Sequence, residues 1–504
     1  MTDRALQLLR RHTHLAELAA FPFDFDLERA DHVEPVRLAS GGPLQPVAGD
    51  DTGGTYFLCG DGSMLYADSE GSAGIIANSV DEALETIIGL PGWRDHVGLS
   101  PQDGEERILA RVAETEEEIR ENYGIDTERA ELRTALGFPE RSPVELVGML
   151  HAALQRTEPD FLLLNGEEGC AYALLDRLPR PPLQEVVLAE GRADLARLRR
   201  EDARTAWDEV AGDAGRRALA LRAAQYDRRD TDLPLLRHLL RRETEASMTD
   251  ELRLGAVLVG LHGLAEDLPL LFEVRETTYD TWCGLAGMPE PGASGEELRE
   301  WARGLDDSLF GTDPSDEPAS TWTDLASGRG MAEHVRVALI RTLDEIDLRA
   351  FVSTRDGKAP DRSDSYELAY LDQEFEDLGD TFQALRAHRL YVPLTSTASD
   401  RASALLRLSR LEREAGRLPA AVSALGQLRD TLARPADDTV AHWRGTNLGT
   451  FVVDEHHEVA SAAAGDPALA AAGREVTEAA SALLAELSEA ARRAVRAPST
   501  PSAG

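Results

Sequence analysis

Apolar residues recur at helical spacing over the first 20 positions of the chain, and the pattern changes at Phe21. Residues 1–20 therefore predict an amphipathic helix. From Phe21 onward apolar and acidic residues alternate, which is the period of a half-buried strand. We expect this strand to open a new domain. The alternating residues are Phe23, Asp24, Phe25, Asp26, Leu27 and Glu28.

Short strands joined by turns are predicted next. Residues 55–59 and 64–67 are rich in apolar and aromatic side chains, and the turn sequence Gly60, Asp61, Gly62 separates them. This arrangement predicts a β-hairpin. A third short strand is expected nearby, at residues 74–77.

The clearest helix signal in the chain begins at Ser79. Ser79 and Glu82 have the spacing of a capping box, in which each side chain accepts a hydrogen bond from a free backbone N–H of the first turn. An apolar stripe over residues 80–88 is wide enough to cover one face of the preceding sheet. Residues 21–100 are therefore predicted to form a compact α+β domain.

Beyond residue 100 the pattern is mainly helical and contains an internal repeat. The string Asp-Leu-Pro-Leu-Leu at residues 232–236 recurs 35 residues later, at 267–271. An aspartate just before a proline is a helix-start signal, because the side chain can cap free N–H groups and proline lacks one. Repeats of this length are typical of helical solenoids, whose units bury their apolar faces against one another. Chance recurrence of a leucine-rich string is the alternative.

These patterns predict an α+β N-terminal module, with a short antiparallel sheet and a covering helix, followed by a mostly all-α helical-repeat region. They divide the chain into seven segments. The segments are an N-terminal helix (1–20), an α+β domain (21–100), a helical connecting region (101–185), helical repeats (186–290), a loop-rich linker (291–330), a helical region with a hairpin turning at Gly416 (331–435), and a C-terminal helix with a flexible tail (436–504).

Composition indicates a folded, multi-domain protein. The 504 residues are 42% hydrophobic and 29% charged, and a chain of this length exceeds one ordinary core. No stretch reaches the roughly 18 apolar residues of a membrane span, and the N-terminus lacks the apolar run of a signal peptide. A cytoplasmic protein that does not bind membranes is therefore expected. Its three cysteines are too scattered for a disulfide framework or a paired-cysteine metal site.

The formal net charge of -38 argues against a general nucleic-acid binder, because phosphate contacts need clustered lysine and arginine. Residues 192–242 are a local exception, since arginines outnumber acids there. We interpret this stretch as solvated helix faces. A separate anionic or RNA ligand for it is the alternative.

No pattern in the sequence specifies a metal or a cofactor. His456, His457 and Glu458 form the densest set of possible metal ligands, but Ser461 stands where a zinc-protease helix would place its second histidine. An exposed acidic turn is the favoured interpretation. Glycine pairs in the chain lack the spacing and the Lys-Ser/Thr of a phosphate loop. We therefore expect neither a metal nor a cofactor.

Two sets of residues have the types that catalysis needs. Cys283 could act as a nucleophile with His262 as its base, but we favour a thiol packed in the repeat core, because the spacing places no orienting Asn or Asp beside it. Asp24 and Asp26 share one face of a predicted strand, as paired carboxylates would, but a solvated sheet face fully explains their alternation with Phe23 and Phe25 and is the favoured interpretation. We therefore expect no enzymatic activity.

The predicted α+β domain carries a set of short motifs. They are Ala48-Gly49-Asp50, Gly53-Gly54, Tyr56-Phe57-Leu58, Gly60-Asp61-Gly62, Leu65-Tyr66 and the capped helix from Ser79. This set resembles the core of the SUKH superfamily, and the resemblance covers about residues 21–100, under a fifth of the chain. Members of this superfamily occur as immunity proteins that neutralise toxins in bacterial polymorphic toxin systems, and as binding modules in larger proteins.

The helical part of the chain has resemblances of its own. The 35-residue repeat resembles HEAT-type helical repeats, and the hairpin around Gly416 is similar to a tetratricopeptide unit. Members of all three groups bind proteins and have no catalytic residues in these motifs. The resemblances therefore imply a non-enzymatic protein that binds another protein.

The function that follows is neutralisation of a toxin by the α+β domain. The resemblance implies a protein partner, and an acidic face suits a basic nuclease toxin through electrostatic steering. The alternative is a helical-repeat scaffold whose concave surface holds another protein. The residues expected on the partner surface of the α+β domain are Asp50, Asp51, Tyr56, Tyr66 and Asp68.

Overall fold

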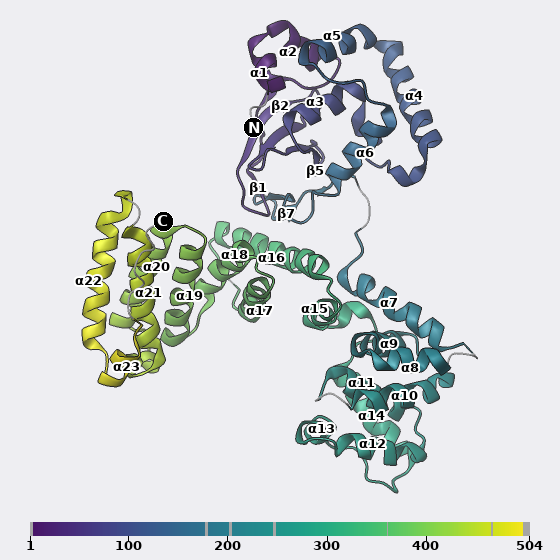
Figure 1. Cartoon of the computed structure of the whole chain (residues 1–504), viewed down its shortest axis with the longest axis vertical. Coiled ribbons are helices and arrows are strands. Elements are labelled where there is room, and N and C mark those ends of the chain that lie inside the picture. The colour runs from purple at the N-terminus through teal and green to yellow at the C-terminus, as the bar shows by residue number, and fades with distance from the viewer. Residues whose placement is uncertain are drawn as a thin grey trace. The chain divides into compact units, whose positions relative to one another are not determined.

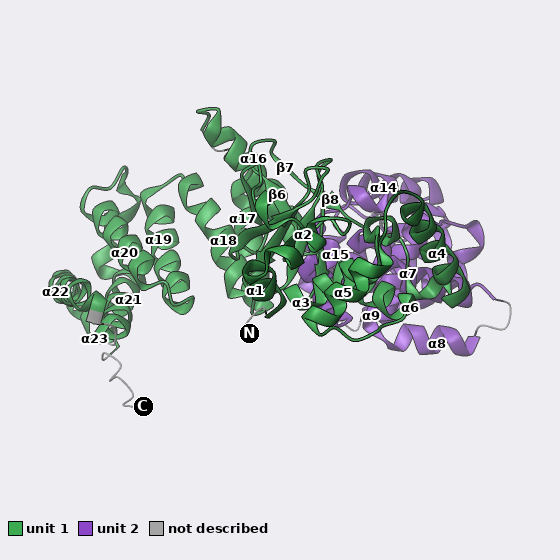
Figure 2. Cartoon of the chain, turned by 90° about the horizontal axis from the view of Figure 1, so that it is seen from above, with its two compact units in different colours: residues 1–178, 339–504 green, residues 179–338 purple. Residues whose placement is uncertain are grey.

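The structure is a computed structural model that describes residues 4–176, 180–200, 204–244, 248–359, 361–464 and 467–496. The chain forms two compact units (Figure 2). Unit 1 contains residues 1–178 and 339–504, and unit 2 contains residues 179–338. An α+β fold at the N-terminus is followed by helices, which confirms the predicted fold class (Figure 1).

Two small sheets form the centre of the N-terminal domain. The larger sheet has the strand order β2-β3-β4-β5-β8. Adjacent strands in it are antiparallel, except that β5 and β8 are parallel. The smaller, antiparallel sheet has the order β1-β6-β7. The predicted hairpin and third strand are confirmed as β3, β4 and β5. The strands are β1 (Val36–Leu38), β2 (Leu44–Gly49), β3 (Thr55–Cys59), β4 (Met64–Ala67), β5 (Ser72–Ala77), β6 (Leu163–Asn165), β7 (Cys170–Ala171) and β8 (Ala173–Leu174).

The alternation after Phe21 predicted a strand, and this prediction is wrong. Only a single bridge, Asp26 to Gly49, joins this segment to the sheet, and a short 3-10 helix, η1 (Leu27–Arg29), follows it. Asp24 has a left-handed backbone with φ of 57°, which interrupts an extended chain. Phe23 and Phe25 are both buried in the domain core, so the alternation reflects anchoring of an irregular segment.

The predicted helix after Ser79 is α3 (Val80–Gly89), and it covers the larger sheet (Figure 1). The Ser79 hydroxyl accepts a hydrogen bond from the Glu82 N–H, as predicted. The Glu82 carboxylate instead accepts from the side-chain amide of Asn78, so the box is only half formed. The single helix predicted at residues 1–20 is two helices, α1 (Arg4–Arg11) and α2 (Thr13–Ala20).

The core of this domain does not end at residue 100, where the sequence pattern placed a boundary. Helices α4 (Glu105–Asn122), α5 (Asp126–Leu136) and α6 (Pro143–Leu154) contribute buried residues to the same cluster as α1, α3 and the sheet. Strand β8 then completes the larger sheet. The predicted segments 1–20, 21–100 and most of 101–185 therefore form one α+β domain.

Unit 2 is helical, and the repeated Asp-Leu-Pro string opens two of its helices. Asp232 and Asp267 do not cap those helices with their side chains. Each buried carboxylate instead pairs with an arginine of an earlier helix region, Arg199 for Asp232 and Arg237 for Asp267. The helices are α7 (Leu183–Leu198), α8 (Arg204–Gly212), α9 (Ala214–Tyr226), α10 (Leu233–Glu243), α11 (Asp250–Leu261), α12 (Leu268–Arg275), α13 (Tyr279–Gly284), α14 (Gly295–Leu309) and α15 (Ala319–Gly328).

Helix α16 (Ala332–Arg355) leads into the C-terminal helices of unit 1. The predicted turn at Gly416 is confirmed, and its φ of 72° suits glycine. The segment predicted as a loop-rich linker, 291–330, contains helices α14 and α15. The single helix predicted in the segment 436–504 is three helices, α21, α22 and α23. The flexible tail predicted at the end of this segment, from Pro498, lies outside the described residues. The helices are α17 (Asp364–Asp377), α18 (Thr381–Tyr391), α19 (Ala398–Glu414), α20 (Leu418–Ala433), α21 (Asn447–Ala464), α22 (Ala470–Glu486) and α23 (Glu489–Ala494).

Candidate functional site

Three of the five residues that we predicted on a partner surface are buried. Asp50 is 2% exposed, and Tyr56 and Tyr66 are fully covered. Only Asp51 is well exposed, and Asp68 is half-buried. The prediction is therefore wrong for Asp50, Tyr56 and Tyr66, because helix α3 and the segment around Trp93 cover this face of the sheet.

Asp50 is the centre of a buried hydrogen-bond network. Its carboxylate accepts from the Gly54 N–H at 2.8 Å and from the Tyr66 hydroxyl at 2.5 Å, and it pairs with Arg94. Burial acts to raise the pKa of Asp50, but the Tyr66 hydrogen bond and the Arg94 charge outweigh it and hold the pKa below its ordinary value. Arg94 also reaches Asp24 at 2.6 Å. The network fixes the loop after β2 and offers no contact surface.

The exposed part of this domain carries an aromatic pair that the sequence did not single out. The Phe21 side chain follows the end of α2 and is 54% exposed, and Tyr123 follows the end of α4 and is 49% exposed. Their ring centroids are 5.1 Å apart at an angle of 90°, an edge-to-face contact. Exposed pairs of large aromatic rings are typical of protein interfaces.

Three exposed acidic residues lie within the six positions before Tyr123 on α4. The exposed side chains of Glu117, Glu118 and Glu121 form no ion pair within the part of the chain that the structure describes. Glu121 stands in the last turn of α4 and Glu118 directly precedes that turn, close to the end where the helix dipole already presents partial negative charge. Acids at this position oppose helix stability, so a role in contact explains them better than a role in folding. We call these five residues, Phe21, Glu117, Glu118, Glu121 and Tyr123, the aromatic-acidic face.

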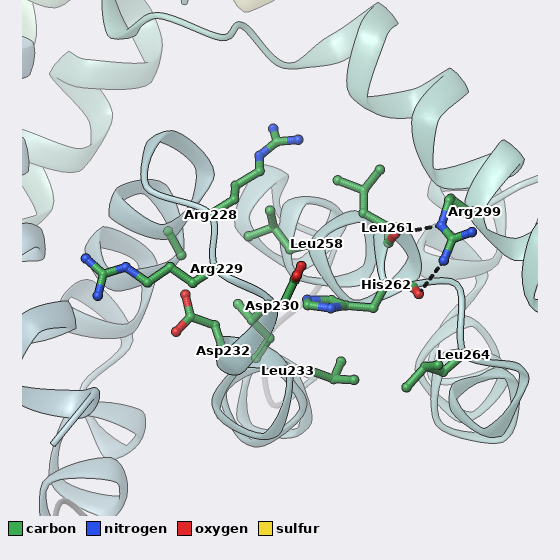
Figure 3. A pocket seen from close by; sticks show the side chains of 12 residues that line it. Arg228, Arg229, Asp230, Asp232, Leu233, Leu258, Leu261, His262, Leu264 and Arg299 are labelled. Atoms are coloured by element: carbon green, nitrogen blue, oxygen red, sulfur yellow. Dashed lines mark hydrogen bonds between the residues drawn. The ribbon is translucent and has the colours of Figure 1, made fainter. Parts of the chain in front are cut away.

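Unit 2 contains a groove of about 610 Å³ near the first copy of the repeat (Figure 3). Arg299 donates to the carbonyl oxygens of Leu261 at 3.2 Å and His262 at 2.8 Å, as the dashed lines in Figure 3 show. The His262 ring points toward Asp230 in the same view, and burial lowers its pKa. The apolar lining consists of Ala224, Leu233, Leu236, Leu258, Leu261 and Leu264.

The charged residues of this groove are largely neutralised within the chain. Arg228 pairs with Asp306, at 2.7 Å, and Asp232 pairs with Arg199, at 2.6 Å. Because these groups are satisfied, a ligand meets the apolar lining together with Asp230, which forms no ion pair among the residues that the structure describes. The groove therefore suits an apolar side chain of a partner better than an anion.

The catalytic alternatives are not assembled. Cys283 is exposed, contrary to the packed thiol that we favoured, and its side chain meets Tyr279; it does not line the groove that contains His262. Asp24 is paired with Arg94, whereas Asp26 caps η1 through the Glu28 N–H at 2.8 Å. The two carboxylates are therefore held by different partners.

The arginines of residues 192–242 are held mainly in ion pairs between helices. Arg216 contacts Asp194 at 2.5 Å, and Arg217 pairs with the buried Glu243. This use of the guanidinium as a bidentate donor explains the excess of arginine without a separate ligand. Further pairs are Arg192 with Glu185, Arg197 with Glu209, and Arg222 with Glu251.

The possible metal ligands His456, His457 and Glu458 lie on helix α21, and their side chains are not gathered at one site. His456 is fully buried and its Nδ1 lies 2.7 Å from the Val452 carbonyl oxygen, whereas Glu458 lines a different groove. His456 is therefore part of the helix core, not of the exposed acidic turn that we expected. No group of three potential metal ligands occurs in the described ranges.

Lowering the pH from about 7 to about 5 is expected to destabilise α21. Burial lowers the pKa of His456 from 6.5 to about 4, so the unfolded chain takes up a proton that the folded chain does not. Stability is complete above pH 6.5 and falls as the pH decreases toward 4, by on the order of 2 to 3 kcal/mol. Hydrogen–deuterium exchange of α21 peptides, corrected for intrinsic rates, measures this. His456→Phe should flatten the dependence and the exposed His12→Gln should not; an unchanged dependence in His456→Phe contradicts the assignment.

None of the helices is, over the residues described, both long and apolar enough to cross a membrane. Comparisons of the chain with protein-family models, with curated proteins and with solved structures give no match.

Proposed function

We propose that this chain is a non-catalytic binding protein whose α+β domain holds a basic partner protein. The observation that supports this is the aromatic-acidic face, which combines two exposed rings with glutamates that have no intrachain ion pair. Rings of this kind supply most of the energy of an interface, and the surrounding charge selects the partner and speeds its association. The resemblance to SUKH immunity proteins suggests that the partner is a toxin that the chain neutralises.

The double variant Phe21→Ala/Tyr123→Ala tests this proposal. A basic protein captured by the full-length chain, once purified, is expected to bind the variant about 1,000-fold more weakly, because each of the two rings contributes on the order of 2 kcal/mol at an interface centre, or about 30-fold in affinity. Isothermal titration calorimetry measures the change. A basic partner that binds the double variant with unaltered affinity would contradict the proposal, as would a chain that captures only acidic proteins.

Charge variants give a second and independent measurement. Glu117→Gln/Glu121→Gln should slow association and weaken its dependence on salt, because both acids act through long-range attraction. Glu105→Gln/Glu106→Gln is the matched control, since these exposed acids lie at the other end of the same helix. Equal effects of the two double variants would show that the net charge of the chain, and not this face, governs association.

A helical scaffold is the second candidate, and the groove in unit 2 favours it. Leu264 lines this groove and is 41% exposed, so a partner side chain can reach it. If the scaffold function is the correct one, Leu264→Glu abolishes partner binding while Phe21→Ala/Tyr123→Ala leaves it intact. The reverse result supports the α+β domain as the binding part.

A further inference from the structure

A second exposed aromatic pair lies on helix α13 of unit 2. Tyr279 is 77% exposed and Trp282 is 51% exposed. Their ring centroids are 6.2 Å apart and the planes differ by 19°, so the rings are stacked nearly parallel. The residues are three positions apart on one helix, which places both rings on the same side. Adjoining exposed rings form a contiguous apolar patch, which marks a candidate interaction site, whereas singly exposed residues are common on protein surfaces.

The short helix that carries this pair is held rigidly. The Thr281 side chain is fully buried, and its hydroxyl is bonded to the carbonyl oxygens of Arg275 and Thr278, both at 2.9 Å. At the other end Arg253 donates to the Gly284 carbonyl oxygen at 3.2 Å, and Leu285 is fully buried. The rings therefore stand on a fixed support, which reduces the entropy lost when a ligand binds.

The chain around the pair is acidic. Four exposed acids lie between residues 273 and 290, and Arg275 is the single basic residue in this range. Arg275 is buried and is already engaged by Glu276 and Glu290, both at 3.2 Å. Asp280, next to Tyr279, forms no ion pair among the described residues. A cationic group approaching the rings is therefore attracted by Asp280, while the two arginines that contact this segment, Arg253 and Arg275, are each already paired with acids.

We infer that Tyr279 and Trp282 form a binding surface for an arginine side chain of a basic protein segment. A guanidinium is flat and weakly hydrated, so it stacks on aromatic faces and gains cation–π energy there. The acids around the rings select this cation over an uncharged ligand. The surface belongs to unit 2 and does not depend on the aromatic-acidic face, so it goes beyond the proposed function.

Fluorine NMR of the full-length chain labelled with 5-fluorotryptophan tests this inference. The chain has six tryptophans, and Trp282→Phe identifies the Trp282 resonance by its loss. The probe is a short glycine-arginine peptide, titrated at low salt, and the control is the same peptide with citrulline, the uncharged analogue of arginine. We expect a saturable shift of the Trp282 resonance with the arginine peptide and none with the citrulline peptide.

The variant Tyr279→Ala should weaken arginine-peptide binding by about 3-fold to 30-fold, the range of one cation–π contact. Tyr366→Ala removes another exposed tyrosine, 84% exposed, and should leave the shift unchanged. Phe21→Ala/Tyr123→Ala should also leave it unchanged, so the proposed function can fail without affecting this result. Equal binding of the citrulline peptide, or an arginine titration that does not move the Trp282 resonance, overturns the inference.

Discussion

Replacing Asp50 with alanine is expected to lower the free energy of unfolding of the α+β domain by about 2 to 4 kcal/mol. The substitution removes the acceptor of the Tyr66 hydroxyl and the Gly54 N–H, and it removes one of the two carboxylates that pair with Arg94, which keeps Asp24. Buried donors left without an acceptor are among the more destabilising changes in proteins. The effect is therefore much larger than that of any surface acid in this domain.

Hydrogen–deuterium exchange of peptides from β2, β3 and β4, combined with denaturant unfolding, measures this change locally in a multi-domain chain. Asp51→Ala is the matched control, because the Asp51 side chain is 60% exposed and its ion pair is with the exposed Arg29. The control should change the free energy of unfolding by less than about 1 kcal/mol. Similar effects of the two substitutions would refute the central place of Asp50 in the network.

Replacing Arg222 with methionine is expected to destabilise unit 2 by about 3 to 5 kcal/mol. Arg222 is 1% exposed and contacts Glu251 at 2.8 Å and the buried Glu317 at 3.4 Å. Methionine fills much of the same volume but leaves both carboxylates without a counter-charge. The loss is therefore electrostatic in origin.

Neutralising Glu251 and Glu317, the two acids left without a counter-charge, tests whether the loss of stability is electrostatic. The triple variant Arg222→Met/Glu251→Gln/Glu317→Gln should recover most of the lost stability, because uncharged groups are far less costly to bury. Arg303→Met is the matched control, since Arg303 is 60% exposed and its nearest acid is 3.9 Å away. Exchange rates of peptides from α9 and α11 report the change. A triple variant as unstable as the single one would point to lost packing in place of lost charge.

The local elements of the fold could be predicted from the sequence because local chemistry determines them. The hairpin of β3 and β4 follows from its glycine turn, and the start of α3 follows from the Ser79 cap. The segment after Phe21 was mispredicted because tertiary packing buries both Phe23 and Phe25 while Asp24 turns the backbone. Periodicity alone cannot distinguish these two arrangements.

The binding residues could be predicted less well, because burial depends on both sides of the sheet. Alternation along β3 predicts one buried and one exposed face, yet Tyr56 packs into the core with α3, and Phe57 packs under the smaller sheet. Strand β6 pairs with β1 in the smaller sheet, and β8 pairs with β5 at the edge of the larger sheet. Both strands lie about a hundred residues after their partners in the sequence. Phe21 and Tyr123 are similarly distant in sequence, so no local pattern brings them together.

The most direct test of the account is a hydrogen–deuterium exchange comparison of the full-length chain with and without its captured partner. If the α+β domain holds the partner, protection appears at the aromatic-acidic face, in peptides that contain Phe21 and in those covering residues 117–123. Protection confined to the groove of unit 2, around His262 and Leu264, or no protection within the α+β domain, would contradict it.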